Sequence, residues 1–212
     1  RVFPQPADCF RIGKVFLERD QPARAVRYLR VAGGRADARP VYVAWLARAL
    51  AAAGDTAGAA AALARIAGDP VQKAPLATIE NRSLDVAFLS GSGPDGEDLV
   101  ALWKLWRPGP ASARWRLVPA ADGIHVRIVS DFHWRCLEAR GNTTVLTAVR
   151  DTPAQEWRFI TLAGGQRRIV SRSDGRSLAI IPGSGNQRPA LTLVPAGDSP
   201  LQKWSLEITN PL

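Results

Sequence analysis

Side chains that commonly do acid–base or nucleophilic chemistry are scarce in this chain. His125 and His133 are the only two histidines, and they stand eight positions apart around a predicted β-hairpin. No cysteine, serine or carboxylate lies at a spacing from them that predicts a catalytic triad or a metal site. The sequence also contains no phosphate-binding glycine loop and no dinucleotide fingerprint. We therefore expect a protein that is not an enzyme and that uses no cofactor.

One cluster of carboxylates falls in a segment rich in glycine. Residues 91–98 read Gly-Ser-Gly-Pro-Asp-Gly-Glu-Asp, so that Asp95, Glu97 and Asp98 stand close together. Such a composition predicts a turn or loop. The spacing of the three carboxylates does not match the calcium-binding loop of an EF-hand. We expect a solvated loop here and no metal site.

An internal repeat organises the second part of the chain. Four residues recur 41 positions later: Ile128, Val129, Ser130 and Leu137 become Ile169, Val170, Ser171 and Leu178. Both copies close on Gln-x-Trp followed by alternating apolar residues. A weaker first copy runs from Ile79 to Trp115, with Ala113 in place of the glutamine. Three copies of about 40 residues predict one module of short strands.

This pattern resembles the ricin B-chain type lectin family, whose β-trefoil consists of three such units around a pseudo-threefold axis. The resemblance covers about residues 78–208 and implies an all-β domain over residues 76–212. Burial of large indoles and hydrogen bonds from glutamine amides would close the units. The residues expected to have this structural role are Trp115, Trp157, Trp204, Gln155 and Gln202.

The resemblance also implies where sugars would bind. Lectins of this family use an acidic residue after the Cys-Leu position, an aromatic residue on the following strand, and polar groups near the closing Gln-x-Trp. In the first unit these positions correspond to Asp85, Trp103 and Ser112. The alternative is that Asp85 bonds turn amides and that Trp103 packs in the core or at a domain interface.

The other two units match the family pattern less well. In the second unit Glu138 takes the acidic position, but the expected strand carries no aromatic residue. Trp134, at the tip of the preceding hairpin, could substitute if it folds over the site. In the third unit Ala179 removes the acceptor, so we expect no sugar binding there.

The first part of the chain predicts two helical hairpins, over residues 7–34 and 41–68, with breaks at 20–22 and 54–55. Matching residues lie 34 positions apart, and this period resembles the tetratricopeptide repeat and its Sel1-like relatives over about residues 7–70. The resemblance implies a domain at residues 1–75 whose first helices line a peptide groove. Lys14 and Arg48 would lie on that groove and meet a carboxylate, unless both are ordinary exposed cations.

Charge and composition limit the classes of partner. The net charge of the 212 residues is +9. Residues 1–75 hold 12 lysines and arginines against 6 acidic residues, whereas residues 76–212 hold 16 against 13. A basic surface favours acidic partners in general, although a solvated helix face is the simpler explanation. The trefoil part has no basic stripe interleaved with aromatic residues, so nucleic-acid binding is not expected.

The sequence contains no run of 18 apolar residues, which predicts that no segment spans a membrane. Two cysteines, Cys9 and Cys136, fall in different predicted domains and give no disulfide framework. The chain begins at Arg1 and contains no methionine. We therefore expect a processed or excised piece, and the lectin-like module favours a secreted or periplasmic location.

The sequence thus predicts an α+β protein of two separate domains, a short array of helical hairpins followed by an all-β trefoil. Its expected function is noncatalytic binding of a carbohydrate, such as an acidic polysaccharide of a bacterial or host surface. The alternative is an adaptor or assembly factor. In that case the trefoil has lost sugar binding, and the helical repeats or the domain junction hold a protein partner.

Overall fold

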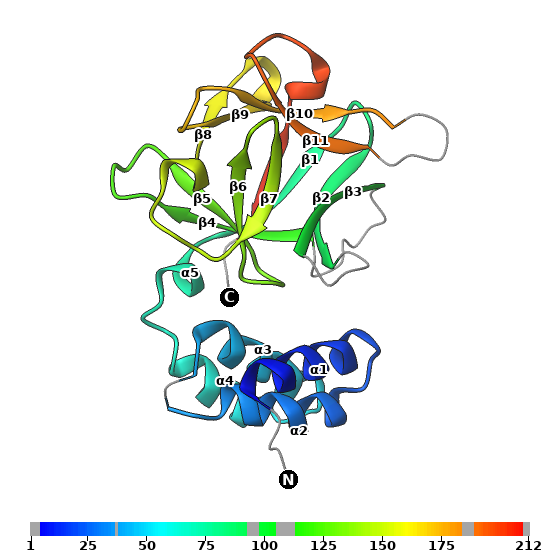
Figure 1. The fold of residues 1–212 in the computed structure, drawn as a ribbon, viewed down its shortest axis with the longest axis vertical. Helices are drawn as coiled ribbons and strands as arrows, with labels where there is room; N and C mark the ends of the chain where they lie inside the picture. Colours follow the sequence, from blue (N-terminus) through cyan, green and yellow to red (C-terminus); the bar gives the residue numbers. More distant parts are fainter. Residues whose placement is uncertain (1–4, 37, 93–97, 105–112, 184–188, 210–212) are drawn as a thin grey trace. The chain divides into compact units, whose positions relative to one another are not determined.

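The structure is a computed structural model that describes residues 5–36, 38–92, 98–104, 113–183 and 189–209. The chain forms two compact units, Arg1–Lys73 and Ala74–Leu212. Helices make up the first unit, and an antiparallel sheet makes up the second (Figure 1). In the described part of the chain, no helix is long and apolar enough to cross a membrane.

Four helices form the two predicted hairpins of the first unit: α1 Pro6–Glu18, α2 Pro22–Gly33, α3 Pro40–Ala52 and α4 Thr56–Ala64. A short helix, α5 Pro70–Lys73, follows them. Proline begins α1, α2 and α3, where its missing N–H costs nothing because that group has no partner within the helix. Asp55 caps α4 by accepting a hydrogen bond of 2.8 Å from the N–H of Gly58.

Small residues let these helices approach closely. The helices pack in sequence, α1 against α2, α2 against α3, and α3 against α4. A Cβ atom on Gly13 would lie 2.6 Å from Cγ of Leu29, and one on Gly33 would lie 2.5 Å from the carbonyl oxygen of Tyr42. Leu29 is fully buried at this contact. The glycines therefore set the distance between neighbouring helices.

Twelve strands of the second unit fall into three groups of four. The first group is β1 Leu76–Asn81, β2 Val86–Ser92, β3 Asp98–Lys104 and β4 Arg114–Pro119. The second is β5 Val126–Ser130, β6 Cys136–Arg140, β7 Thr143–Thr147 and β8 Glu156–Thr161. The third is β9 Arg167–Ser171, β10 Ser177–Ile181, β11 Ala190–Val194 and β12 Ser205–Thr209. Between strands of the second and third groups, 3-10 turns lie at Pro153–Gln155, Ala163–Gly165 and Pro200–Gln202.

The outer strands of each group close into a barrel. Strand pairing runs from β1 through β4, β5 and β8 to β9, and β12 pairs with β1. Two backbone hydrogen bonds between Arg167 and Trp204, of 2.7 and 2.8 Å, join β9 to the start of β12. The middle strands form three hairpins, β2 with β3, β6 with β7, and β10 with β11 (Figure 1). Closure of this kind leaves the barrel without an open edge.

The closing tryptophans tie each hairpin to the barrel. Trp115, Trp157 and Trp204 are fully buried. Their indole N–H groups donate to the carbonyl oxygens of Phe88, Leu137 and Leu178, at 3.1, 2.9 and 3.0 Å. A buried indole needs such an acceptor, because an unpaired N–H in the core is costly. Because the same bond occurs once in each group of strands, it shows which residues of the three groups are structurally equivalent.

Gly33→Ala tests the close helix contact. Alanine is the better helix former by up to about 1 kcal/mol, but its Cβ would meet the backbone of Tyr42. We expect a net destabilisation of the helical unit by about 1–2 kcal/mol, because overpacking at a rigid contact commonly costs that much or more. Hydrogen exchange of α2 and α3 amides measures it.

The matched control is Gly68→Ala, since a Cβ on Gly68 would meet nothing within 4 Å. Unchanged exchange protection in Gly33→Ala would contradict the packing assigned to α2 and α3.

Candidate functional site

The tryptophan bonds locate the position that follows the acceptor carbonyl in each unit. These residues are Leu89, Glu138 and Ala179, one step after Phe88, Leu137 and Leu178. Strand pairing gives the same equivalence, because the residues one step before the acceptors, Ala87, Cys136 and Ser177, pair with Glu80, Val129 and Val170 on the first strand of each unit. Glu138 is the one charged residue of the three. The second unit therefore has a carboxylate at the position that follows the acceptor carbonyl.

The structure places the predicted acidic residue of the first unit, Asp85, in a turn. Asp85 lies three residues before Phe88, so its equivalents are Trp134 and Gly175. All three have positive φ angles, 54°, 55° and 71°. Asp85 is thus an exposed turn residue at the tip between β1 and β2. The structural equivalent of Glu138 is Leu89, which lies four residues after Asp85. The sequence match of Ser83-Leu84-Asp85 to Cys136-Leu137-Glu138 is therefore four residues out of register.

The expected aromatic position of the first unit shifts for the same reason. Trp103 pairs with Ala87, and the equivalent residue of the second unit is Thr147, which pairs with Cys136. The residue opposite Leu89 is instead Ala101. The side chain of Trp103 is not among those described, and Ser112 lies outside the described residues. In the second unit Val145 faces Glu138, and the equivalent residue of the first unit is Ala101 and not Trp103.

Trp134, the expected substitute for an aromatic residue beside Glu138, is buried. Only 8% of its surface is exposed, and its backbone adopts the left-handed conformation at the tip between β5 and β6. An indole in this state cannot present its face to a sugar ring.

The carboxylate of Glu138 has three side-chain neighbours. Its Oε2 accepts a hydrogen bond from Thr147 Oγ1 at 2.7 Å and lies 3.0 Å from Gln155 Nε2. Its Oε1 lies 3.3 Å from a guanidinium nitrogen of Arg140. The Glu138 side chain keeps 15% of its surface exposed. The result is a fixed planar acceptor that solvent can reach.

Burial and hydrogen bonding act in opposite directions on the pKa of Glu138. Burial raises it, whereas hydrogen bonds from Thr147, Gln155 and Arg140 lower it. The net effect places the pKa of Glu138 below its ordinary value. Glu138 is therefore ionised at neutral pH and can only accept hydrogen bonds.

Gln155 and Gln202 each close a loop with the same two hydrogen bonds. Gln155 Oε1 accepts from the N–H of Arg150 at 2.7 Å, and Nε2 lies 2.8 Å from the carbonyl oxygen of Ala148. Gln202 makes the same two bonds, from the N–H of Gly197 at 2.9 Å and to the carbonyl of Pro195 at 3.2 Å. These bonds close the loop before each Gln-x-Trp.

The additional contacts of Gln155 reach the candidate site, because its Nε2 also approaches Glu138 and lies 2.7 Å from Thr147 Oγ1. In the third unit the corresponding residues are Ala179 and Val194, which offer no side-chain acceptor. In the first unit Ala113 replaces the glutamine. Neither the role of Thr147 nor this contact is visible in the sequence, since both depend on pairing between β6 and β7.

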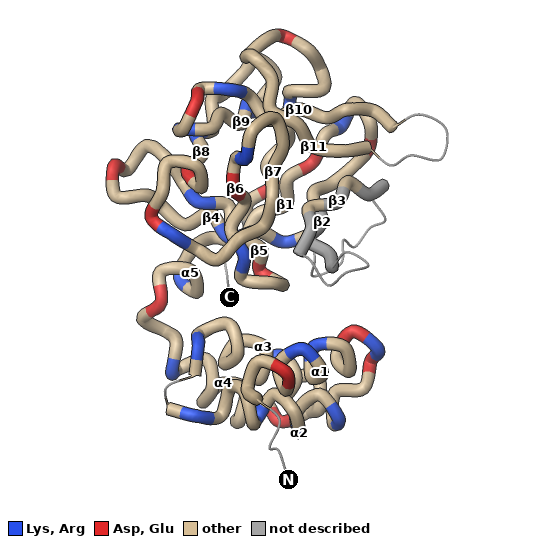
Figure 2. The backbone as a smooth tube through the Cα atoms, viewed as in Figure 1, with Lys and Arg blue, Asp and Glu red and all other residues tan. Residues whose placement is uncertain are grey.

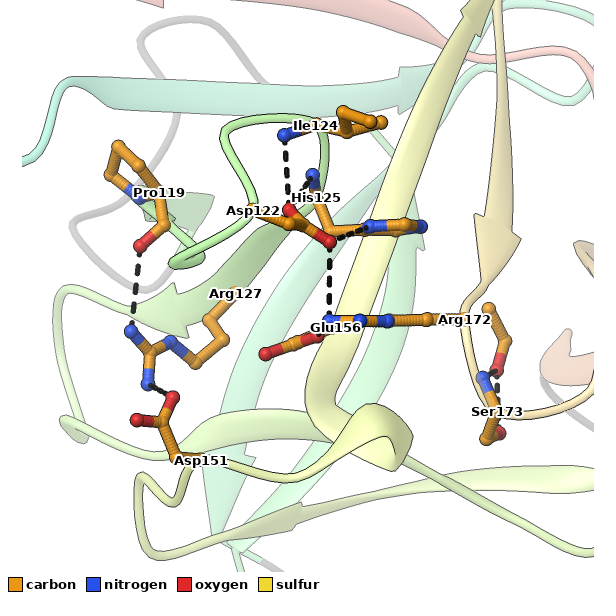
Figure 3. A network of polar contacts seen from close by, with 10 residues as sticks. Pro119, Asp122, Ile124, His125, Arg127, Asp151, Glu156, Arg172 and Ser173 are labelled. Atoms are coloured by element: carbon orange, nitrogen blue, oxygen red, sulfur yellow. Dashed lines mark hydrogen bonds and ion pairs between the residues drawn. The ribbon is translucent and has the colours of Figure 1, made fainter.

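A second polar cluster surrounds the loop between β4 and β5 (Figure 3). Asp122 accepts from the N–H groups of Ile124 and His125, and its Oδ2 lies 2.7 Å from His125 Nδ1 and 3.1 Å from Arg172. Arg172 also contacts Glu156. Hydrogen bonds from the backbone and ring of His125 hold the pKa of Asp122 well below its usual range. Each carboxylate already has donors from the protein, so the cluster fixes the loop.

The structure brings the two predicted groove cations of the helical unit to one aromatic ring. Lys14 Nζ lies 5.8 Å, and the guanidinium carbon of Arg48 5.6 Å, from the ring centroid of Trp45. Lys14 comes from α1, Arg48 and Trp45 from α3, and Trp45 is fully buried. Both cations are half-buried. Cation–π contacts of this length are attractive.

Comparison with solved structures gives the fold of the second unit. The designed threefold-symmetric protein ThreeFoil is 18% identical with a TM-score of 0.53, and the match covers 62% of this chain and 96% of that one. The BEL β-trefoil in an apo crystal form is 17% identical with a TM-score of 0.53, over 64% of this chain and 93% of that one. The second unit is therefore a β-trefoil.

An enzyme also contains a region of similar fold. The exo-β-1,3-galactanase 1,3Gal43A of Clostridium thermocellum is 16% identical with a TM-score of 0.53, over 64% of this chain and 30% of that one. No family model and no curated protein matches the sequence.

Gln155→Ala and Gln202→Ala separate loop closure from support of Glu138. Each variant loses the two loop hydrogen bonds, so we expect each to lower the free energy of unfolding by about 1–3 kcal/mol in urea denaturation. Only Gln155→Ala removes a donor to Glu138, so only this variant should raise the pKa of Glu138.

Titration of the Glu138 carboxyl by NMR measures the second effect. An unchanged pKa in Gln155→Ala, or an equal rise in Gln202→Ala, would show that Gln155 does not hold the carboxylate.

Proposed function

We propose that this chain is a noncatalytic carbohydrate-binding protein whose site is the β6–β7 hairpin of the second trefoil unit. The observation that carries the proposal is the Glu138 carboxylate, which is ionised, partly exposed and held by Thr147 and Gln155. Two carboxylate oxygens at fixed positions can accept hydrogen bonds from neighbouring hydroxyls of one sugar ring. Because the acceptor is already oriented, little conformational entropy is lost on binding.

The surroundings of Glu138 supply the remaining contacts. Val145 faces it across the hairpin and is partly exposed, so it offers a small apolar surface to the C–H groups of a sugar. Thr143, at the exposed end of β7, adds a hydroxyl. A valine covers less of a sugar ring than an aromatic residue does. We therefore expect weak binding by a single site, in about the millimolar range.

Two kinds of similarity support the proposal. The repeats resemble those of ricin-type lectins, and Glu138 takes the acidic position of that pattern. A region of the same fold occurs in a solved exo-β-1,3-galactanase, whose name indicates that it acts on a polysaccharide. A surface polysaccharide as ligand implies that the chain is secreted or periplasmic.

One observation favours the second candidate, a protein adaptor. Lys14 and Arg48 meet at the ring of Trp45, and both come from the helices that line the groove in tetratricopeptide-like arrays. Two cations on neighbouring helices fit a carboxylate at the end of an extended peptide. In this account the helical unit holds the partner, and the trefoil serves as a scaffold.

A panel of neutral and acidic glycans, with Glu138→Gln and Asp85→Asn, tests the proposal. Both variants replace a carboxylate by an amide of the same size and remove one negative charge. We expect the parent to bind, Glu138→Gln to bind roughly tenfold more weakly or worse, and Asp85→Asn to bind like the parent. Asparagine also tolerates the positive φ at position 85.

Circular dichroism serves as the folding control. If both variants, still folded, bind like the parent, the site is not at Glu138. A parent that binds no glycan on the panel would favour the adaptor, and peptides with a free carboxylate would then be the ligands to try.

A further inference from the structure

The outward face of the β6–β7 hairpin carries more than the acceptor. Side chains alternate along a strand, so Glu138 and Arg140 share one face of β6. Val145 and Thr143 lie opposite them on β7. The other face belongs to the core, because Leu137 and its partner Leu146 are buried.

Arg140 is available to a ligand. Its side chain keeps 62% of its surface exposed, and one guanidinium nitrogen lies 3.3 Å from Glu138 Oε1. Within the described residues, this carboxylate is its ion-pair partner. An exposed pair of this kind is weak, because water competes for both charges. The planar guanidinium can therefore turn to an incoming anion and bind it through two parallel N–H donors.

Spacing along the strand matches the size of one sugar ring. The Cα atoms of residues two positions apart on a strand lie about 7 Å apart, so Glu138 and Arg140 can hold groups of a ligand at roughly that separation once the guanidinium turns away from the carboxylate. Figure 2 shows the acidic and the basic position on β6. A pyranose whose hydroxyls bind Glu138 would place its far edge near Arg140. Val145, beside Glu138 on β7, would contact the ring.

The other two units lack this combination. The residues equivalent to Glu138 and Arg140 are Ala179 and Ile181 in the third unit and Leu89 and Gly91 in the first. Ile181 is 53% exposed, so the same position in the third unit presents an apolar side chain to solvent. A carboxylate and a guanidinium on one face are therefore particular to the second unit.

We infer that the sugar bound at this site is a pyranose carrying a carboxylate, such as a hexuronic acid. Glu138 accepts hydrogen bonds from its hydroxyls, and Arg140 binds its carboxylate. The inference rests on the proposed function of the same hairpin and adds the chemical class of the ligand. Discrimination arises because a neutral sugar leaves the guanidinium without a new partner, whereas a uronic acid supplies one.

Calorimetric titration of the full chain with methyl β-glucuronide and methyl β-glucoside tests this assignment. The two probes differ only at C6. We expect the glucuronide to bind roughly tenfold more tightly, as a charge-assisted hydrogen bond allows. Arg140→Gln should abolish that preference. Glu138→Gln should weaken both probes.

Arg158→Gln is the matched control, because Arg158 is an exposed arginine on β8 and its loss changes the net charge equally. Equal weakening in Arg140→Gln and Arg158→Gln would overturn the inference by showing a general charge effect. Equal affinity of the parent for both probes would also overturn it, while leaving Glu138 as a sugar site. If neither probe nor the matching galacto pair binds, or if Glu138→Gln binds like the parent, the proposed function itself fails.

Discussion

The bond from a buried indole N–H to a hairpin carbonyl is the interaction on which the trefoil depends. It occurs three times, from Trp115, Trp157 and Trp204, and each time it joins the last strand of a unit to the second strand of the same unit. Because the bond is directional and its donor is fully buried, it fixes the register of each hairpin against the barrel. A slip of one residue would turn the outward face of the hairpin inward.

That fixed register determines where a binding site can exist. In the second unit the residue after the acceptor carbonyl is Glu138, whose side chain keeps part of its surface exposed. Gln155 closes its loop as Gln202 does, and it also reaches the carboxylate and hydroxyl beside it. One structural residue thereby supports both the fold and the site. The repeated residues build the fold, whereas the candidate site consists of residues that differ between the units, such as Glu138 and Thr147.

Much of the fold could be predicted from the sequence, because it depends on periodic signals. The 41-residue displacement and the recurring Gln-x-Trp indicated the three-unit fold. Proline and glycine marked the ends of the helices. The observed hairpins begin one residue before the predicted starts, and they end one and four residues before the predicted ends. Burial of the three tryptophans also follows from the repeat, since a large aromatic residue at the same point of each unit belongs in a shared core.

The site was harder to predict, because strand register is not visible in a single sequence. Ser83-Leu84-Asp85 resembles the family phrase, but Asp85 suits a turn with positive φ, a conformation that aspartate tolerates better than most residues. The true equivalent of Glu138 is Leu89, which only the tryptophan bond and the strand pairing reveal. Support of Glu138 by Thr147 and Gln155 spans 9 and 17 positions, beyond the reach of local patterns.

Mapping of amide chemical shifts by NMR during titration with methyl β-glucuronide tests the central claim most directly, because it locates the ligand without any substitution. The account predicts saturable shifts that are largest for residues 138–147 and for the side-chain amide of Gln155. Saturable shifts centred on the turn at Asp85, or on α1 and α3, would contradict it, as would the absence of any saturable shift.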